Sequence, residues 1–239
     1  MVRNHLATIA APKTLRTERK GGEKWIARVR PGAHPLHRSL TLNYILKNVL
    51  KHATSTKEIN KILYEKNLTV DKKIRLDHKF GVGLMDVVEI EKLGEAYRVL
   101  LNNNGELVLR KITKKDSELK ILQVVKKTMI KKGKLQLTFH DGRNLSVDKT
   151  KLNIGDSVIF DLGKKQVVKE IPLENNSLAL LSGGKHIGKL ATIKDIIKVK
   201  NLEKPKVVVD IDGKEYITLM SYAFAVGKNK PEVNLGEKE

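Results

Sequence analysis

The most informative part of the chain runs from Ser39 to Asp86 and reads SLTLNYILKNVLKHATSTKEINKILYEKNLTVDKKIRLDHKFGVGLMD. Its first part places apolar side chains at helical spacing, which predicts a short amphipathic helix. Ser39 is expected to cap this helix, because its hydroxyl can accept a hydrogen bond from an N–H of the first turn. The side chains expected on the buried face are Leu42, Ile45, Leu46, Val49 and Leu50, and those expected in solvent are Asn43, Lys47, Asn48 and Lys51.

A second helix is predicted directly afterwards. Ser55 with Glu58 three residues later is a capping-box pattern, in which side chains and backbone satisfy each other at the start of a helix. Ile59, Ile62 and Leu63 then form an apolar stripe at helical spacing. We therefore expect two short amphipathic helices in succession.

The second half of the stretch is predicted to be extended. Residues 68–70 indicate a strand and residues 71–73 a turn. Because glycine has no Cβ, Gly81 and Gly83 are expected to let the backbone turn sharply before the next strand. The apolar residues expected to face the core are Ile74, Leu76 and Phe80.

Basic side chains line the outer side of these helices and of the turn. Cations this dense on one side are typical of a surface that binds a polyanion. The alternative is a small α+β unit with a solvated basic surface. The candidate RNA-binding residues of this stretch are Lys47, Lys51, Lys57, Lys61, Lys72, Lys73 and Arg75.

The whole chain has the same bias toward positive charge. Its 239 residues include 47 Lys and Arg against 27 Asp and Glu, a net charge of +20. Nucleic acid is therefore the first candidate partner and an anionic membrane surface the second. We find no apolar run of about 18 residues that would span a membrane. The basic N-terminal part also lacks the apolar run and cleavage site of a secretory signal.

Aromatic and cysteine content narrow the kind of partner and site. Aromatic residues make up only 4% of the chain, which argues against recognition dominated by stacking on exposed rings. Phosphate and shape recognition of folded RNA fits this composition better. The absence of cysteine excludes a disulfide framework and a thiolate metal site, and it fits a reducing cytosol.

Residues 1–38 are predicted to be a basic extension. Nine basic residues face two acidic ones, and proline and glycine interrupt any long helix. The segment is either a disordered tail or an arm that becomes ordered on RNA, where counterion release favours binding. Trp25, the only tryptophan, is interpreted as a packing anchor rather than a base-stacking surface. The candidate RNA-binding residues here are Arg3, His5, Lys13, Arg16, Lys24, Arg28, Arg30, His34 and Arg38.

Residues 87–172 are predicted to be all β. Strands this short and this closely spaced suggest a small barrel, interpreted as scaffold, with a partner-binding surface as the alternative. Asp141-Gly142 predicts a hairpin with a type I′ turn. The expected strands cover 87–90, 96–100, 107–109, 135–139, 144–147, 154–160 and 166–171, with a helical turn at 114–118.

Residues 173–226 are predicted to form a second small barrel. A glycine-rich loop at 182–189 separates the strands 178–181 and 190–197, and Asp212-Gly213 indicates another hairpin. The loop fits the spacing of a phosphate-binding P-loop, yet Leu190 stands where that motif needs Ser or Thr. A strand instead of a helix follows, so nucleotide hydrolysis is disfavoured.

Other arrangements of chemistry-bearing residues are also disfavoured. His34 and His37 are close in sequence, but Pro35 lies between them and no cysteine is available, so a zinc site is not expected. A catalytic pair of carboxyl groups needs a cleft in which the two groups have different pKa values, and nothing in the sequence indicates one. Asp77 and Asp86 are therefore interpreted as turn or cap residues.

The order of motifs resembles a known family. The two helices followed by Val70-Asp71-x-Lys73-Ile74-Arg75-x-Asp77 and Gly83-x-Met85-Asp86-Val87 are similar to the small S-four RNA-binding domain. The version in the S-four-e family of small-subunit ribosomal proteins is the most similar. That family usually has Gly after Val-Asp, whereas this chain has Lys72, for which a left-handed conformation is costlier.

Further segments resemble the same family. Residues 5–40 resemble its N-terminal signature, 221–231 its C-terminal one, and the loop at 182–189 a KOW motif. The KOW resemblance implies that glycines there let the backbone approach RNA. Ala191 stands where the motif often has Gly. The candidate RNA-binding residues that these two segments add are Gly184, Lys185, His186, Lys189, Lys228 and Lys230.

The resemblance implies a mostly β, α+β protein of five segments. They are a basic extension (1–38), an S-four-like RNA-binding module (39–92), a central β-barrel domain (93–172), a C-terminal SH3-like KOW barrel (173–226) and a mobile tail (227–239). The implied function is that of a structural constituent of the cytoplasmic small ribosomal subunit. Its partners are then small-subunit ribosomal RNA and neighbouring ribosomal proteins.

No catalysis, cofactor, metal, membrane or small-molecule substrate is expected. Two alternatives belong to other classes of protein. One is an RNA-modifying enzyme or synthetase, since S-four-like modules are often appended to those. The other is a non-ribosomal transcription or translation regulator that uses its KOW barrel.

Overall fold

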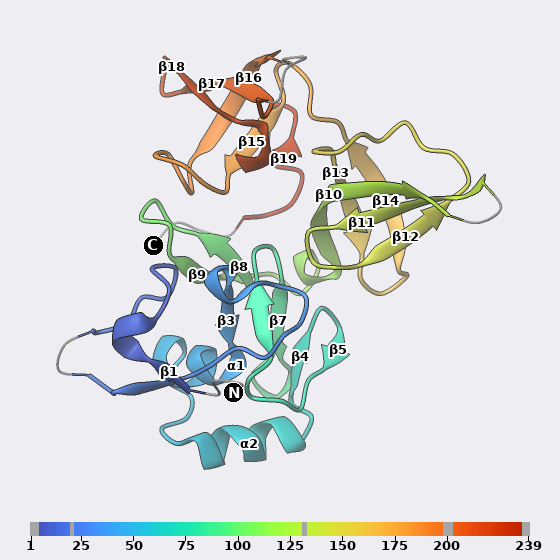
Figure 1. Ribbon diagram of the computed structural model, residues 1–239. Helices are drawn as coiled ribbons and strands as arrows, with labels where there is room; N and C mark the ends of the chain where they lie inside the picture. Colours follow the sequence, from blue (N-terminus) through green and yellow to red (C-terminus); the bar gives the residue numbers. More distant parts are fainter. Residues whose placement is uncertain (1–4, 20–21, 131–132, 198–202, 236–239) are drawn as a thin grey trace. The chain divides into compact units, whose positions relative to one another are not determined.

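The chain is mostly β-structure with two short helical regions (Figure 1). The computed structural model describes residues 5–19, 22–130, 133–197 and 203–235. The chain divides into two compact units. Apart from the chain's last residues, the first unit extends to Leu100 and includes Glu106–Glu118, and the second holds Leu101–Gly105 and Leu119–Leu235.

A five-stranded sheet forms the centre of the first unit, in the order β5-β4-β7-β8-β9. The expected boundary between residues 92 and 93 falls between β7 and β8, which pair with each other. The sheet therefore continues past that boundary. Its strands are β4 (Leu68–Val70), β5 (Lys73–Ile74), β7 (Val87–Ile90), β8 (Glu95–Leu101) and β9 (Leu107–Ile112), with 3-10 turns η4 (Glu91–Leu93) and η5 (Asp116–Glu118).

The first helical region begins two residues later than the sequence predicts. Ser39 lies in β3 (Ser39–Thr41), and the Thr41 hydroxyl accepts the capping hydrogen bond from the Tyr44 N–H at 3.1 Å. Asn43 is buried and Val49 is exposed, the reverse of the expectation. The region is α1 (Leu42–Tyr44) continuing as the π-helical turn η3 (Ile45–Val49). The π-helical turn explains the error, because it changes the angular spacing on which the helical pattern relies.

The second helix, α2 (Thr56–Tyr64), confirms the capping box. The Ser55 side chain accepts from the Glu58 N–H at 3.3 Å, and the Glu58 carboxylate accepts from the Ser55 N–H at 3.4 Å. Ile59 and Leu63 are fully buried, as their spacing predicts.

The segment after β5 differs from the prediction in two ways. Ile74 and Leu76 are exposed instead of facing the core. Residues Gly81–Gly83 form the buried strand β6, which pairs antiparallel with β3, so these glycines do not make a sharp turn. A Cβ on Gly83 would overlap the His34 ring, so glycine serves close packing there.

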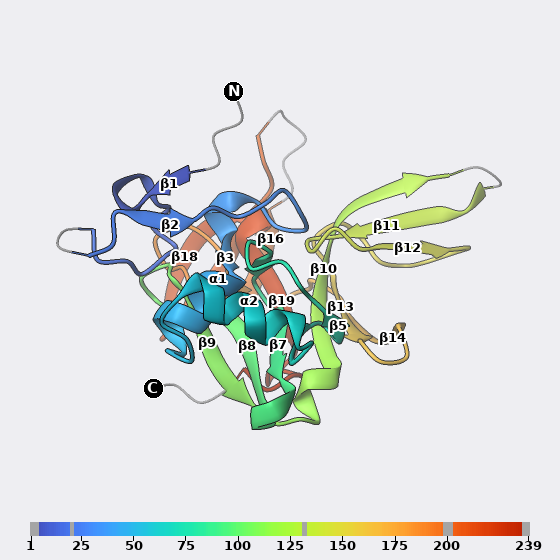
Figure 2. The ribbon, with the colours of Figure 1, turned by 90° about the horizontal axis from the view of Figure 1, so that it is seen from below.

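The N-terminal arm is folded onto the first unit over its described residues. β1 (His5–Ala7) pairs antiparallel with β2 (Trp25–Ala27), and β2 lies beside α1 (Figures 1 and 2). Leu6, Ala11 and Leu15 are buried, so a disordered tail does not describe this segment. Trp25 is 55% exposed, so its interpretation as a packing anchor is wrong. The arm's 3-10 turns are η1 (Thr8–Ala10) and η2 (Leu36–Arg38).

The second unit begins with a sheet in the order β12-β11-β10-β13-β14. The long strand β10 was missed in the sequence. It pairs with β13 over its first half and β11 over its second, with an irregularity between Val124 and Lys126 that interrupts strict alternation. The strands are β10 (Leu119–Met129), β11 (Leu135–Phe139), β12 (Asn144–Val147), β13 (Ser157–Asp161) and β14 (Gln166–Ile171).

The turn between β11 and β12 is not type I′. Such a turn needs positive φ at both central residues, but Gly142 has φ 77° and Asp141 is not in that region. The backbone N–H of Gly142 donates to Phe139 O at 3.0 Å, and that of Phe139 to Arg143 O at 2.9 Å. The hairpin itself is confirmed, with a four-residue connection.

A second sheet of this unit has the order β18-β17-β16-β15-β19. The predicted glycine-rich loop connects β15 to β16, and Asp212-Gly213 makes a tight turn with φ 54° and 79°. The expected tail is folded back as far as Leu235, because Val233 is buried. The strands are β15 (Leu178–Leu181), β16 (Leu190–Ile197), β17 (Lys206–Ile211), β18 (Lys214–Leu219) and β19 (Ala223–Gly227), with the 3-10 turn η7 (Met220–Tyr222).

Candidate nucleic-acid interface

The predicted RNA-binding residues differ widely in accessibility. Those on the arm and α2 are mostly in solvent, where a phosphate can reach them. Arg3 lies outside the described residues. The exposed ones are His5, Lys13, Arg16, Lys24, Arg30, Arg38, Lys51, Lys57, Lys61, Lys72, Lys73, Gly184, Lys185, Lys228 and Lys230, and the half-buried ones are Arg28, Lys47, Arg75, His186 and Lys189.

A hollow of about 930 Å³ opens in the first unit between the arm hairpin and the first helical region. Residues of the arm and of 43–51 line it, and so does Thr56 at the start of α2. Its basic lining residues outnumber its acidic ones, Glu18 and Glu23. The basic ones are Arg16, Arg28, Lys47, Lys51 and Lys79.

Two contacts hold the arm at this hollow. The Tyr44 hydroxyl donates to the backbone oxygen of Arg16, and Lys47 forms an ion pair with Glu23. Burial lowers the pKa of His78, another lining residue. Burial thus disfavours the charged form of this imidazole, and the permanent positive charges of the hollow are its arginines and lysines.

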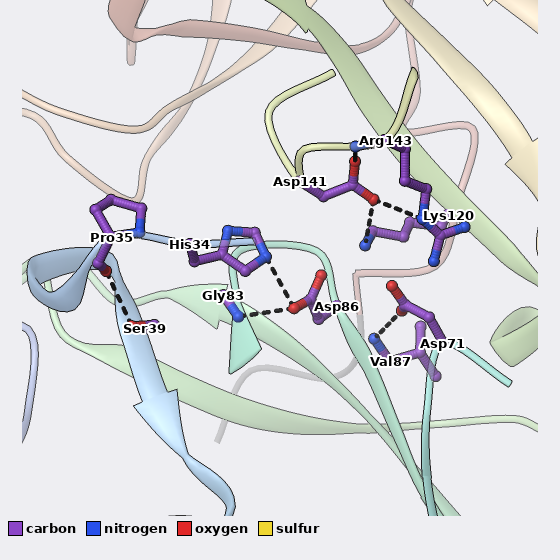
Figure 3. Close-up of polar contacts among 10 residues, drawn as sticks. All are labelled: His34, Pro35, Ser39, Asp71, Gly83, Asp86, Val87, Lys120, Asp141 and Arg143. Atoms are coloured by element: carbon purple, nitrogen blue, oxygen red, sulfur yellow. Dashed lines mark hydrogen bonds and ion pairs between the residues drawn. The ribbon is translucent and has the colours of Figure 1, made fainter. Parts of the chain in front are cut away.

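His34, a predicted RNA-binding residue, is buried and holds a structural contact within the first unit (Figure 3). Its side chain is buried, and its Nε2 lies 2.9 Å from Asp86 Oδ2. The same carboxylate oxygen accepts the Gly83 N–H at 2.8 Å. The Ser39 hydroxyl donates to Pro35 O at 2.9 Å, which fixes the chain just after the histidine. Asp86 is thus the turn residue that the sequence predicts, with a histidine partner that it does not reveal.

Lys72 is also engaged within the protein. Asp71 and Lys72 both have positive φ, 50° and 59°, so the lysine adopts the left-handed conformation that usually favours glycine. Its ammonium lies 2.7 Å from Glu89 Oε1 and 3.2 Å from Ser117 Oγ. The Asp71 carboxylate accepts the Val87 N–H at 3.0 Å, which fixes the turn (Figure 3). A phosphate would have to compete with Glu89 for Lys72, whereas Lys73 is exposed.

The second unit contains a buried ionic cluster that the sequence analysis missed (Figure 3). Lys120 on β10 is fully buried, and its ammonium lies 3.1 Å from Asp141 Oδ2. Arg143 Nε lies 2.9 Å from the same oxygen. Burial alone would raise the pKa of Asp141, but the Lys120 charge and the Arg143 N–H outweigh it and lower that pKa. The cluster pins the β11–β12 connection to β10.

Arg98 is a second buried cation that was missed. It lies on β8 of the first unit, and its guanidinium donates to Asp116 O at 2.8 Å. Burial lowers its pKa to about 10, while Asp116 and Asp71 favour the charged form. Its two-residue spacing from the buried Ala96 and Leu100 in β8 is the sequence signal that its side chain faces inward.

The glycine-rich loop is partly committed to packing. A Cβ on Gly183 would meet the Tyr222 ring at 2.7 Å, and one on Gly188 would overlap the Asn102 backbone in the same unit. The His186 ring lies 4.2 Å from that of Tyr216. Gly184 and Lys185 at the tip are the exposed part. The loop therefore offers less backbone to RNA than its glycine content indicates.

Comparisons with known proteins give the family. A model described as "Ribosomal family S4e" matches residues 93–167. Small ribosomal subunit protein eS4 of Methanothermobacter thermautotrophicus is 37% identical over 213 residues, which cover 89% of this chain and 88% of that protein. The chain belongs to the S4e family. The protein of the same name from Methanocella arvoryzae is 35% identical and covers 98% of both chains.

A solved member of the S4e family has a similar fold. The crystal structure of the 30S ribosomal protein S4e from Thermoplasma acidophilum matches with a TM-score of 0.69 and 31% identity. The match covers 80% of this chain and 96% of the Thermoplasma acidophilum chain. In the described part of this S4e chain, no helix is long and apolar enough to cross a membrane. Within the same residues, no cluster of three or more His, Cys, Asp or Glu suits a metal ion.

Proposed function

We propose that this protein is a structural constituent of the small ribosomal subunit and binds its ribosomal RNA. The observation that carries the proposal is the match over 98% of both chains to a protein named small ribosomal subunit protein eS4. A match over the full length supports the same role for the whole chain, instead of one shared module. The net charge of +20 supports a polyanionic partner.

The proposed mechanism is recognition of phosphates and shape. Exposed arginines and lysines of the arm, of residues 47–51 and of α2 neutralise RNA phosphates and release counterions. The sheet and the folded arm hold these cations in a fixed arrangement, so the match to a folded RNA selects the docking position. The protein catalyses no reaction in this proposal.

The proposed layout keeps the five segments of the sequence analysis as functional regions. The S-four-like module and arm are the main RNA-binding surface, and the tip of the KOW-like loop at Gly184 and Lys185 is a smaller one. The central β domain is scaffold. Neighbouring ribosomal proteins are the proposed protein partners, and the cytoplasmic ribosome is the proposed location.

A salt titration tests the mechanism. If six to ten phosphates are contacted, affinity for small-subunit ribosomal RNA should fall roughly 10³–10⁵-fold between 50 and 200 mM salt, on the scale of duplex DNA. Filter binding at several salt concentrations measures this slope. A flat response would contradict phosphate recognition.

Two further measurements separate the alternatives. An eS4-like constituent should co-sediment with small subunits and resist a moderate salt wash, whereas a KOW-type regulator would sediment mostly away from them. An RNA-modifying enzyme would leave modified nucleosides after incubation with bulk RNA, which the proposed function does not.

A further inference from the structure

We propose that the hollow beside the arm hairpin takes one unpaired base of the bound RNA, with Trp25 as the stacking surface. The inference rests on the proposed function, because it adds one specific contact to a general phosphate interface. It gives the only tryptophan of the chain a role that the fold does not supply.

Trp25 is placed as a recognition residue. It lies on β2 at the wall of the hollow with 55% of its surface exposed. A tryptophan carries so much apolar surface that leaving it in water forgoes a large stabilisation, unless a partner covers it. The His5 ring lies 5.7 Å away at a tilt of 56°, and the Lys24 ammonium is 5.5 Å from the indole centre. Neither contact buries the ring.

The lining of the hollow suits the other parts of a nucleotide. Arg16, Lys51 and Lys79 supply positive charge for the flanking phosphates. Asn48 and Thr54 supply amide and hydroxyl groups that can hydrogen-bond to a base edge or a 2′-hydroxyl. A volume of about 930 Å³ is within the range of pockets that hold a small ligand, and it is far too small for a paired helix.

A free anion explains the hollow less well than a nucleotide does. The start of α2 is not available for an anion, because Ser55 and Glu58 satisfy each other's backbone N–H groups there. Glu23 already neutralises Lys47 on the arm side. Contact with an indole ring would not stabilise a bound phosphate, whereas it stabilises a stacked base.

A cationic segment of a neighbouring protein would also stack on tryptophan. The basic lining opposes that occupant, since Arg16, Lys51 and Lys79 would repel it. An unpaired base combines an aromatic face with negative phosphates on both sides, which matches both features of the hollow. In a fully paired helix the base faces are covered by their neighbours and cannot reach the indole.

Tryptophan fluorescence tests the proposal directly, because the chain has one tryptophan. The probes are three RNA hairpins, each closed by the same non-nucleotide linker: one with a single unpaired adenosine in the stem, one with an abasic unit at that position, and one with a fully paired stem. The unpaired adenosine should quench the fluorescence in a saturable titration, and the other two should quench it little. Binding is measured in parallel by filter retention at two salt concentrations.

Variants separate stacking from general binding. Trp25→Ala should weaken binding of the unpaired-adenosine hairpin about five- to hundred-fold, the range for one stacked base, and leave the other two hairpins unchanged. Trp25→Phe keeps an aromatic face and should retain most of the affinity. Tyr64→Ala removes another exposed ring of the first unit, on α2, and should change none of the three.

The outcomes distinguish this inference from the proposed function. Equal quenching and equal affinity for all three hairpins, together with a steep salt response, would overturn the base site and leave phosphate recognition intact. An equal loss for all three hairpins in Trp25→Ala would show a general role of the residue and also overturn the base site. So would an unchanged hairpin affinity with weaker incorporation into small subunits, which would indicate a protein partner. A flat salt response would instead contradict the proposed function.

Discussion

Cationic side chains have different roles in the two units. Around the hollow of the first unit, Lys51 is exposed, and so is Lys57 on α2. In the second unit, Lys120 is fully buried against Asp141, and the same carboxylate oxygen also binds Arg143 (Figure 3). The first arrangement leaves charge for a partner, whereas the second uses charge to fix a loop. The chain's net charge of +20 therefore does not by itself locate an interface.

The difference also affects what each unit tolerates. A buried ion pair is sensitive to the loss of one partner, because the remaining charge stays out of water. Exposed lysines contribute little to folding, since solvent screens them. Substitutions in the second-unit cluster should therefore act on stability, and those at the first-unit surface on RNA affinity.

The largest effect is expected for Asp141→Ala. It leaves the fully buried Lys120 ammonium without this counter-charge, which should lower the free energy of unfolding by about 3–5 kcal/mol. Urea unfolding monitored by circular dichroism measures it. Asp148→Ala is the matched control, because that carboxylate is 84% exposed and pairs only loosely with Lys134 at 3.5 Å. Equal losses in the two variants would show that the buried carboxylate contributes no more to the free energy of unfolding than an exposed one.

The next effect concerns RNA binding. Changing four exposed first-unit lysines to Glu should remove about four phosphate contacts. The variant's affinity should therefore depend less on salt: its loss of affinity between 50 and 200 mM should be about a hundred-fold smaller than that of the wild type. Reversing four exposed second-unit lysines is the control and should change it less. The first set is Lys51, Lys57, Lys61 and Lys73, and the second is Lys126, Lys164, Lys165 and Lys214. Equal changes from both sets would place the interface elsewhere.

Gly83→Ala tests the buried polar cluster of the first unit. The added methyl group would overlap the His34 ring and displace it from Asp86, at a cost of about 1–3 kcal/mol. Thermal unfolding measures the change. Gly32 lies two residues before His34, and a Cβ there would have its nearest neighbour at 3.8 Å, so Gly32→Ala should be close to neutral. A neutral Gly83→Ala would mean that the His34 loop moves freely.

Acid should weaken the second-unit cluster. The pKa of Asp141 is lower in the folded protein than in the unfolded chain, where an Asp carboxyl has a pKa of about 3.9. Between these two pKa values, the unfolded chain therefore binds more protons than the folded protein. The stability that the carboxylate contributes is present above the unfolded pKa and is lost as pH falls through the folded pKa. The urea midpoint should drop more steeply below about pH 4 in the wild type than in Asp141→Asn. Parallel pH profiles would contradict this assignment.

The smallest effect is expected for the helix cap of the first unit. Ser55→Ala removes the side chain that accepts the Glu58 N–H, which should cost about 1 kcal/mol. Lys57→Ala on the same helix is the control and should stay within about 0.5 kcal/mol. Chemical unfolding of both variants under one condition shows whether the cap contributes more than an ordinary surface side chain.

Local patterns in the sequence were sufficient where only neighbouring residues decide the structure. The capping box at Ser55 and the tight turn at Asp212-Gly213 are both confirmed. Each depends on hydrogen bonding or backbone freedom within a few residues. Strand β10 was missed, because its pairing switches from β13 to β11 at an irregularity, which breaks the period of two.

The RNA-binding residues stay predictions, but some of them have contacts within the protein that the sequence did not reveal. His34 pairs with Asp86 and Lys72 with Glu89, and two glycines of the 182–189 loop pack closely, Gly183 and Gly188. Trp25 was expected inside and is exposed. Local patterns could not reveal these contacts or the exposure of Trp25, because whether a side chain is covered depends on segments distant in sequence. His34 and Asp86, for example, are 52 residues apart.

The excess positive charge, the strand-rich character and the hairpins follow from the residues alone, because composition and short-range periodicity do not depend on long-range contacts. Which cations remain available depends instead on how the chain packs. The packing buries Lys120, engages Lys72 with Glu89, and leaves Trp25 at the wall of a basic hollow. The physical reason is that burial and ion pairing arise when distant strands pack together, and no local pattern records which strands those are.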